Sequence, residues 1–279
     1  MDDTDYALGR TSAEYDRLIE QAELFRPLTE RMLRAAGIGT GLRVLDIGCG
    51  VGDVSFLVSE VVGPEGSVVG IDLDGAALRV ADERRIARGV TNVVFREGDA
   101  RSVDSPYLFD AAVGRLVLMF ISDPTAALRL IGERVKPGGI VAFHEWVAGV
   151  SPASAMNFPV LASFQNLLSA AFERSGARLE VGAELYRRMR DAGFEPVPSP
   201  LAEIAMCTDR AVGYRRWALF GLSMLPKIVE YGLAREKEVL DLTERRLRDE
   251  LLEARGLIPL SWLMIGQWAR KPRVEPYAV

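Results

Sequence analysis

Three glycines and two carboxylates stand together in the segment VLDIGCGVGDVS. Gly48, Gly50 and Gly52 follow an apolar run at steps of two, with Asp46 before them and Asp53 after them. Glycines at the turn between a strand and a helix commonly hold a phosphate group. Here the carboxylate of Asp46 would repel a pyrophosphate in a site of low dielectric constant, and Asp53 takes the position of the third glycine in the dinucleotide fingerprint. The segment therefore favours a ligand that carries positive charge and no phosphate.

Other side chains that could do chemistry follow later apolar runs. Asp72 ends the run SVVGID about 20 residues beyond the glycines, a spacing at which a carboxylate can bind ribose hydroxyls. Asp99 follows NVVFREG and could bind a ligand or simply start a turn. His144, the only histidine, follows IVAF and precedes Glu145. At such a position it is either a general base or a hydrogen-bonded structural imidazole, and the pattern leaves both open.

The elements that must position these residues alternate between strand and helix. Apolar runs predict strands at 43–48, 67–73, 92–99, 109–116 and 140–146, with helices at 54–62, 77–89 and 123–139 between them. Continuous apolar strands separated by helices indicate a parallel sheet covered on both faces, with the ligand at the carboxyl ends of its strands. We expect an α/β fold with a doubly wound, mostly parallel, seven-stranded Rossmann-like sheet and helical lid insertions. Later strands are predicted at 201–207 and at 261–272, the last one paired antiparallel at the end of the sheet.

The remaining segments are expected to be helical and to cover the ligand. A helix over 11–38 should be kinked or split at Pro27, and the helical region 209–255 should be interrupted at Pro226. We expect three parts in one domain, namely an N-terminal helical lid (1–39), a cofactor-binding Rossmann-like core (40–146) and a C-terminal part (147–279). The C-terminal part carries lid insertions at about 147–180 and 209–255 together with the last strands.

Composition narrows the class of partner. The chain has 279 residues, a net charge of −5 and a pI near 5.2, which argues against nucleic acid as the main partner. Two cysteines, Cys49 and Cys207, are too few for a disulfide framework, and no metal-ligand spacing surrounds Cys49. The acidic N-terminus does not match a signal peptide, and no apolar run reaches the roughly 20 residues of a membrane span. We expect a soluble, cytoplasmic protein with no metal and no membrane partner.

Five segments together resemble a known family. VLDIGCGVGD, GIDLD, EGDA, VGRLVLMF and VKPGGIVAFHEW follow one another as do the motifs of class I S-adenosylmethionine-dependent methyltransferases, and the resemblance covers about residues 40–146. It implies S-adenosylmethionine as cofactor and S-adenosylhomocysteine as product. This cofactor has an ammonium, a sulfonium and no phosphate, as the charge argument requires.

The resemblance also assigns roles to individual residues. Asp72 would bind the ribose hydroxyls, and Leu73 would pack on adenine. Asp99 would accept a hydrogen bond from the adenine amino group, and the Ala100 amide would lie near the same ring. The remaining cofactor contacts implied by the family are Asp46, Gly48, Gly50, Gly114 and Arg115, the last two beside the methionine moiety. Tyr15 of the first helix could close over the cofactor or only pack on the core.

Methyl transfer from a sulfonium is an in-line displacement, so alignment of the two substrates matters most. Alignment can supply about 7–11 kcal/mol, whereas a general base adds about 10²–10⁴-fold in rate. We expect His144 as the base, if one is used, with Glu145 as second choice. Aromatic residues concentrated in the lid insertions favour a small, aromatic acceptor methylated on oxygen, nitrogen or an electron-rich carbon, such as a specialised metabolite.

Other readings stay open at this point. The chain could bind the cofactor without catalysis, as a sensor or scaffold. A nicotinamide-dependent oxidoreductase shares the sheet and the ribose carboxylate, but it predicts a glycine where Asp53 stands. Exposed aromatic side chains on the insertions could instead form a homodimer interface.

Overall fold

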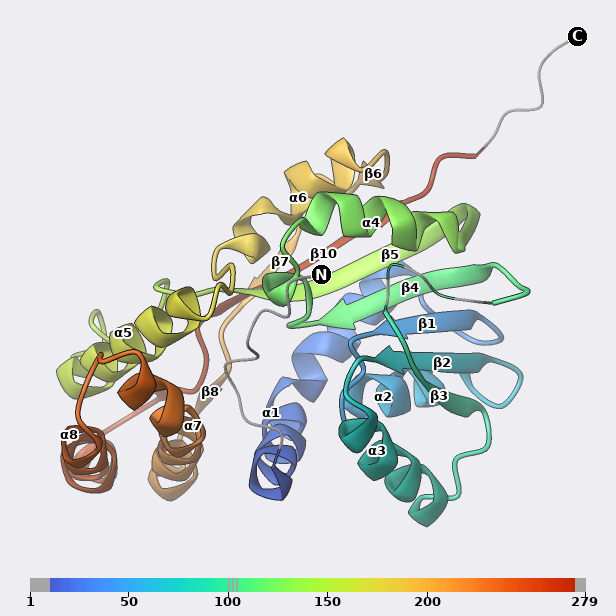
Figure 1. The fold of residues 1–279 in the computed structure, drawn as a ribbon. Helices are drawn as coiled ribbons and strands as arrows, with labels where there is room; N and C mark the ends of the chain where they lie inside the picture. Colours follow the sequence, from blue (N-terminus) through green and yellow to red (C-terminus); the bar gives the residue numbers. More distant parts are fainter. Residues whose placement is uncertain (1–10, 100, 102, 104, 274–279) are drawn as a thin grey trace, which may run out of the picture.

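A single large β-sheet organises the structure, a computed structural model that describes residues 11–99, 101, 103 and 105–273. Seven strands follow one path in the order β3-β2-β1-β4-β5-β10-β6, and an eighth, β7, pairs with β10 (Figure 1). The strand bounds are β1 Arg43–Ile47, β2 Ser67–Asp72, β3 Val93–Glu97, β4 Phe109–Arg115, β5 Val135–Val147, β6 Glu195–Pro196, β7 Leu201–Glu203 and β10 Leu263–Arg270. Strands β1 to β5 are parallel to their neighbours, and β10 is antiparallel to β5. The prediction of a doubly wound, mostly parallel sheet is confirmed.

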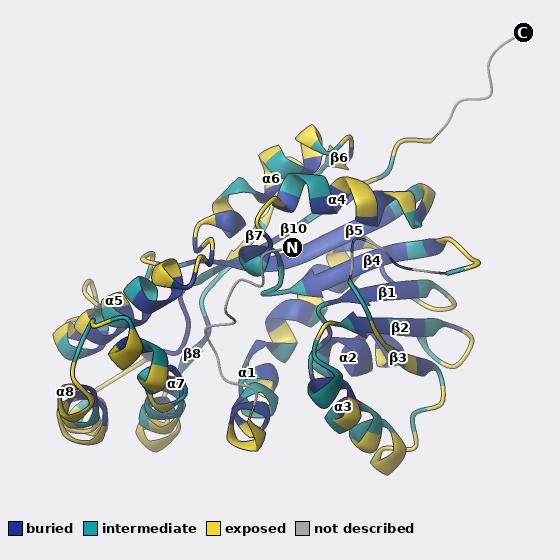
Figure 2. Ribbon diagram, viewed as in Figure 1, coloured by how far each residue is buried: buried dark blue, intermediate teal, exposed yellow. Residues whose placement is uncertain are grey.

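Helices cover both faces of this sheet. One face carries α1 (Ser12–Ala36), α2 (Asp53–Val62) and α3 (Gly75–Ala87), and the other carries α4 (Pro124–Glu133) and α6 (Val181–Asp191). Because successive strand side chains point to opposite faces, Val44 packs with the helices of the first face while Leu45 and Ile47 pack with those of the second. The strands in the middle of the sheet are therefore buried along most of their length (Figure 2).

Several element boundaries differ from the sequence prediction. Helix α1 runs through Pro27 without a break, and α7 (Arg210–Glu230) runs through Pro226. In α1, Phe25 and Leu28 on either side of the proline are both buried, so packing holds the helix together across the missing hydrogen bond. The predicted helix over 123–139 ends at Glu133, and β5 begins at Val135 with a bulge before Ile140.

The predicted strand over 201–207 was wrong in extent. It divides into β7, which joins the main sheet, and β8 (Met206–Cys207), which pairs with β9 (Ile258–Pro259) in a separate small sheet. The last predicted strand is confirmed as β10, which pairs antiparallel with β5 but lies inside the sheet, because β6 and β7 pair with its other edge.

A group of helices lies beyond the carboxyl ends of the parallel strands (Figure 1). We call this group the lid; it consists of α5 (Pro159–Arg174), α7, α8 (Glu236–Asp241), the π-helix η3 (Leu242–Arg246) and α9 (Leu247–Glu253). Helix α7 packs against α5, α9 and α1, and the lid residues Phe172 and Phe220 contact Trp146 of β5, so the lid is attached to the core through both α1 and β5. Within the described residues, every helix is too short or too polar to cross a membrane.

Candidate active site

A cavity of about 240 Å³ opens at the carboxyl ends of β1, β2 and β4. Its walls come from the glycine turn after β1, the ends of β2 and β4, the turn at residues 116–121, the first turns of α1 and two aromatic side chains near the lid. This is the position at which a doubly wound sheet binds its ligand. The polar lining groups come mainly from the ends of β2 and β4, the segments that follow β1 and β3, and the start of α1, whereas residues 116–121 with Trp146 and Phe172 supply apolar groups. We call these two parts of the lining the polar side and the apolar side.

The glycine turn is tight because neighbouring side chains fill the space beside it. Gly48 has φ 64°, and a Cβ there would overlap the side chain of Val117. Gly50 donates its N–H to Asp72 Oδ2 at 2.8 Å, which ties the turn to the end of β2. The residue after the third glycine, Asp53, begins α2 and pairs with Arg84 of α3 at 2.6 Å. Gly48, Gly50 and Asp53 all border the cavity.

Asp72 and Leu73 lie where the sequence pattern predicts them, at the end of β2 and on the cavity wall. The two carboxylate oxygens of Asp72 accept the N–H groups of Gly50 at 2.8 Å and of Asp74 at 2.9 Å. Burial raises the pKa of this carboxyl, and these backbone bonds lower it. Each oxygen can accept a second hydrogen bond, so the carboxylate is able to receive a diol. The Leu73 side chain is 51% exposed, an apolar surface that a flat ring could cover.

Asp99 also borders the cavity, but its carboxylate is engaged by a neighbour that the sequence pattern did not indicate. Arg101 Nε donates to both carboxylate oxygens, at 2.9 and 3.0 Å, and Arg101 itself lines the cavity. This pairing lowers the pKa of Asp99. An amino group bound at Asp99 would therefore share the carboxylate with Arg101. Ala100, predicted to bring its amide to the same ring, lies outside the described residues.

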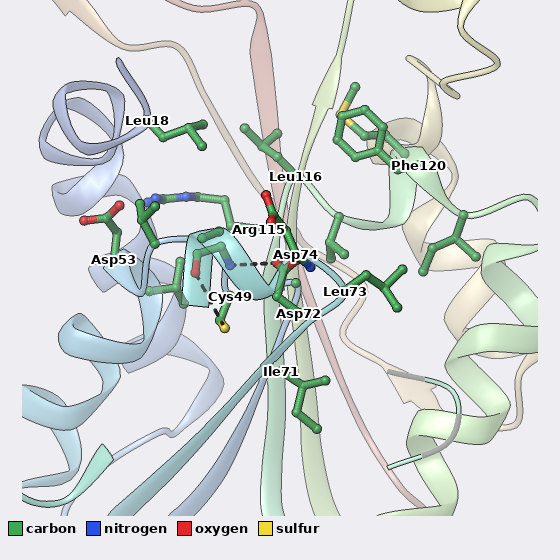
Figure 3. A pocket seen from close by; sticks show the side chains of 18 of the residues that line it. Leu18, Cys49, Asp53, Ile71, Asp72, Leu73, Asp74, Arg115, Leu116 and Phe120 are labelled. Atoms are coloured by element: carbon green, nitrogen blue, oxygen red, sulfur yellow. Dashed lines mark hydrogen bonds between the residues drawn. The ribbon is translucent and has the colours of Figure 1, made fainter. Parts of the chain in front are cut away.

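Arg115 ends β4 and extends along the cavity toward the side on which Asp53 lies (Figure 3). Its Nη1 donates to Thr29 Oγ1 at 3.2 Å, and its guanidinium lies 5.8 Å from the centre of the Phe25 ring. Among the described residues, no carboxylate forms an ion pair with it, although Asp53 and Asp46 are close enough to favour its charged form. A cation on a cavity wall without an ion-pair partner is a ready site for an anionic group.

Gly114 precedes this arginine but does not border the cavity. A Cβ at this position would lie 2.7 Å from Phe143 and 2.9 Å from Val117. The glycine therefore gives room for the turn that follows β4, which packs over it. Its contribution to the site is indirect.

Asp46 lies one layer behind the cavity and not on its wall. It is 1% exposed, Oδ2 accepts the Ser55 hydroxyl at 2.6 Å, and Oδ1 has no hydrogen-bond partner among the described residues. Burial raises its pKa to about 7, against the lowering effects of Ser55 and Arg115. The sequence pattern placed Asp46 at the crevice, and the structure places it at the floor beneath the glycine turn.

The structure does not bring His144 to the cavity. It is 1% exposed on β5, and its Nδ1 lies 3.2 Å from Thr29 Oγ1 of α1. Burial, together with the charges of Arg115 and Arg31, lowers its pKa to about 3. The position at a strand end was read correctly, but the side chain points to the sheet face covered by α1.

Glu145 points to the opposite sheet face and is also absent from the cavity wall. Its Oε1 accepts the N–H groups of Val117 at 2.9 Å and Leu118 at 2.8 Å, and burial raises its pKa to about 7. These bonds hold the turn between β4 and the 3₁₀ helix η2 (Leu118–Phe120). In that turn Leu116 has φ 54°, a left-handed conformation that a leucine rarely adopts.

Tyr15 places the N-terminal helix over the polar side of the cavity. Its hydroxyl donates to Asp74 Oδ2 at 2.8 Å, and Asp74 is the N-cap of α3. Leu18 and Gln21, one and nearly two turns further along α1, line the same wall. Tyr15 thus borders the cavity and bonds α1 to the start of α3, and its contact with the cofactor stays a prediction.

The opposite side of the cavity is apolar and partly aromatic. Its described wall consists of Leu116, Val117, Met119, Phe120, Ile121, Trp146 and Phe172. Trp146 stands at 6.5 Å from Phe172 and 4.9 Å from Trp262, ring centre to ring centre. Of the lid aromatics considered from the sequence, Phe172 reaches the cavity. Four other aromatic side chains and one methionine of the lid insertions do not border the cavity and are buried in the core, namely Phe158, Phe164, Trp217, Phe220 and Met224.

Comparisons with known proteins agree with this geometry. A family model described as a methyltransferase domain matches residues 38–180. Aklanonic acid methyltransferase DauC of Streptomyces sp. (strain C5) is 32% identical over 200 residues, covering 67% of this chain and 90% of its own. Demethylmenaquinone methyltransferase of Geobacillus kaustophilus (strain HTA426) is 30% identical over 206 residues, covering 67% and 86%.

One similar solved structure belongs to a protein named for a different reaction. The [4+2]-cyclase SpnF is 24% identical, with a TM-score of 0.54 over 89% of this chain and 81% of its own. At this identity the likeness shows a shared fold. Since one fold can carry different reactions, the reaction has to be argued from the site.

Proposed function

This chain belongs to the class I S-adenosylmethionine-dependent methyltransferases, and we propose that it methylates a small, flat, aromatic acceptor. The observation that carries the proposal is the division of the cavity into a polar side, with Asp72 and Arg115, and an apolar side, with Phe120, Trp146 and Phe172. The polar side matches the groups of the methyl donor. The apolar side is left for the acceptor.

The polar side fits S-adenosylmethionine group by group. Asp72 would receive the two ribose hydroxyls, Leu73 would pack on the adenine ring, and Asp99 would receive the adenine amino group. Arg115 would bind the carboxylate of the methionine moiety, because it borders the cavity and no carboxylate of the described residues forms an ion pair with it. The sulfonium of the bound donor supplies a methyl group that is already activated for displacement. The protein's own task is to align the two substrates and keep water away.

The apolar side supports a planar acceptor of modest size. Phe120, Trp146 and Phe172 offer ring faces and edges, and Met119 adds a polarisable sulfur. Both relatives named above take their names from small molecules. Together these features support an aromatic specialised metabolite as the acceptor.

The described acceptor side contains no titratable side chain. His144 has a pKa near 3 and Glu145 is bonded to backbone N–H groups, and neither borders the cavity. A general base works best when its pKa lies near the operating pH. We therefore expect an acceptor atom that is nucleophilic without help, either an acidic oxygen ionised at neutral pH or an electron-rich ring carbon.

The direct test measures S-adenosylhomocysteine formed from S-adenosylmethionine with a panel of aromatic acids and phenols. We expect turnover with members such as hydroxynaphthoic acids and none with naphthalene, which has the shape but no nucleophilic oxygen. Calorimetry with S-adenosylhomocysteine and with NAD serves as the control for the cofactor. Tight binding of NAD without binding of S-adenosylhomocysteine would overturn the proposal. Binding of the donor with no turnover across a broad panel would instead favour the non-catalytic reading.

A further inference from the structure

Two buried polar side chains, Thr29 and His144, meet near Arg115 without bordering the cavity. Thr29 of α1 is fully buried, and His144 of β5 is 1% exposed. They come from distant parts of the chain, yet their polar atoms meet beside the guanidinium of Arg115. Burying a hydroxyl and an imidazole in an apolar core is unfavourable unless both are hydrogen-bonded, so the contact needs an explanation.

The three groups form a short hydrogen-bonded chain. Arg115 Nη1 donates to Thr29 Oγ1 at 3.2 Å, and the same Oγ1 lies 3.2 Å from His144 Nδ1. A hydroxyl has one hydrogen and two lone pairs. Since arginine can only donate, Oγ1 accepts from Arg115, and its hydrogen or its second lone pair serves His144 Nδ1, depending on the tautomer of the neutral imidazole.

The surroundings of His144 keep its ring uncharged. Burial and the positive charges of Arg115 and Arg31 lower its pKa to about 3, so the ring is neutral at physiological pH. A protonated ring would be a donor at both nitrogens and could not accept from Thr29. A neutral imidazole can accept from Thr29 or donate to it through Nδ1, and in both cases it ends the chain.

The charges around Arg115 show why such a chain is useful. Asp53 and Asp46 both attract the guanidinium, and a long flexible side chain could turn toward either of them. The side chain already extends toward Asp53 (Figure 3), and the hydrogen bond to Thr29 anchors Nη1 at α1, so that among the described residues the guanidinium closes no ion pair with either carboxylate. In that position its other N–H groups stay available to a ligand.

We propose that Thr29 and His144 are positioning residues that hold the Arg115 guanidinium where it binds the carboxylate of the methyl donor. This inference rests on the proposed function, because it takes S-adenosylmethionine as the ligand. It assigns the only histidine to the donor's carboxylate end and away from proton transfer. It also makes donor affinity depend on a side chain of the N-terminal helix.

The experiment compares two ligands that differ at the carboxylate end. S-adenosylhomocysteine has the complete amino acid moiety, whereas 5′-methylthioadenosine has no carboxylate and no ammonium. Calorimetry on Thr29→Val should show S-adenosylhomocysteine weakened about fivefold or more, with 5′-methylthioadenosine within twofold of wild type. Thr29→Ser restores the hydroxyl and should restore the affinity. His144→Leu should weaken S-adenosylhomocysteine selectively as well, whereas a base acting on the acceptor would leave that affinity unchanged.

A matched control is available in the lid. Thr243 is fully buried, and its hydroxyl bonds to the backbone carbonyl of Val239 at 2.6 Å. Thr243→Val therefore removes an equally buried hydroxyl far from Arg115, and both ligands should bind as in wild type. The inference is overturned if Thr29→Val weakens both ligands equally or weakens neither. A wild-type protein that binds neither ligand would refute the proposed function itself, which separates the two failures.

Discussion

Replacing Glu145 tests whether one buried carboxylate holds the cavity wall. Its Oε1 accepts two backbone N–H groups, from Val117 and Leu118. Glu145→Ala would leave the buried N–H of Leu118 and the part-buried N–H of Val117 without this partner. An unpaired buried donor costs about 1–3 kcal/mol, so we expect a loss of about 1–4 kcal/mol of unfolding free energy. Glu145→Gln keeps an oxygen at the same place and should avoid most of this loss.

The glutamine variant also isolates the cost of the buried charge. The pKa of Glu145 is about 7 in the folded protein and 4.5 as the reference value. Between these two values Glu145 is protonated in the folded protein and ionised in the unfolded one. The wild type therefore loses stability as pH rises from about 4.5 to 7, and its stability stays at the lower level above pH 7. At about 1.4 kcal/mol per pH unit, the advantage of Glu145→Gln over wild type should grow by about 2 kcal/mol between pH 5.5 and pH 8.

Urea unfolding of the three proteins at both pH values measures these differences. Calorimetry with S-adenosylhomocysteine should show weaker binding to Glu145→Ala than to Glu145→Gln, since the turn borders the cavity. If the alanine variant is as stable as wild type, these hydrogen bonds do not hold the turn. If the stability of Glu145→Gln relative to wild type does not increase with pH, the pKa of the Glu145 carboxyl is not raised by burial.

Three further predictions concern the donor site. Asp72→Ala should weaken S-adenosylhomocysteine about tenfold or more in calorimetry, because the ribose acceptor and the Gly50 anchor are both lost; unchanged affinity would contradict the ribose assignment. Gly48→Ala should lower both donor affinity and the melting temperature, since its positive φ and the overlap with Val117 leave no room for a methyl group; a variant with wild-type values would show that the turn can relax. The affinity for cationic S-adenosylmethionine should rise from pH 6 to pH 8 as Asp46 ionises near pH 7, and Asp46→Asn should flatten this profile; equal slopes in the two proteins would show that another group titrates.

The sequence predicted best those features that depend on local pattern. Apolar runs that end in glycine or aspartate located the ends of the strands. Because the carboxyl ends of parallel strands meet at one edge of the sheet, the last residues of these strands lie together at that edge. Asp72, Leu73 and Arg115 therefore reach the cavity as expected. Spacing and charge predicted only that the ligand is positively charged and carries no phosphate. The family resemblance identified it as S-adenosylmethionine.

The sequence could not resolve features that depend on side-chain direction and on distant partners. His144 and Glu145 are neighbours on one strand and point to opposite faces, so their position at its end did not decide whether either reached the cavity. The pairing of Arg101 with Asp99 and the meeting of Thr29 with His144 have no signature in spacing. The lid aromatics could be assigned to core or cavity only by three-dimensional packing.

The left-handed backbone at Leu116 has a consequence for how the site responds to ligands. Such a conformation costs of order 1–3 kcal/mol in a residue with a side chain, and the folded protein carries that cost before any ligand arrives. A cavity wall that already has its bound conformation loses little conformational entropy when a ligand binds. Leu116→Gly would remove this cost and raise the stability of the fold, but the cavity wall would gain conformational freedom and select less strictly among acceptors. Stability and selectivity therefore oppose each other at this residue.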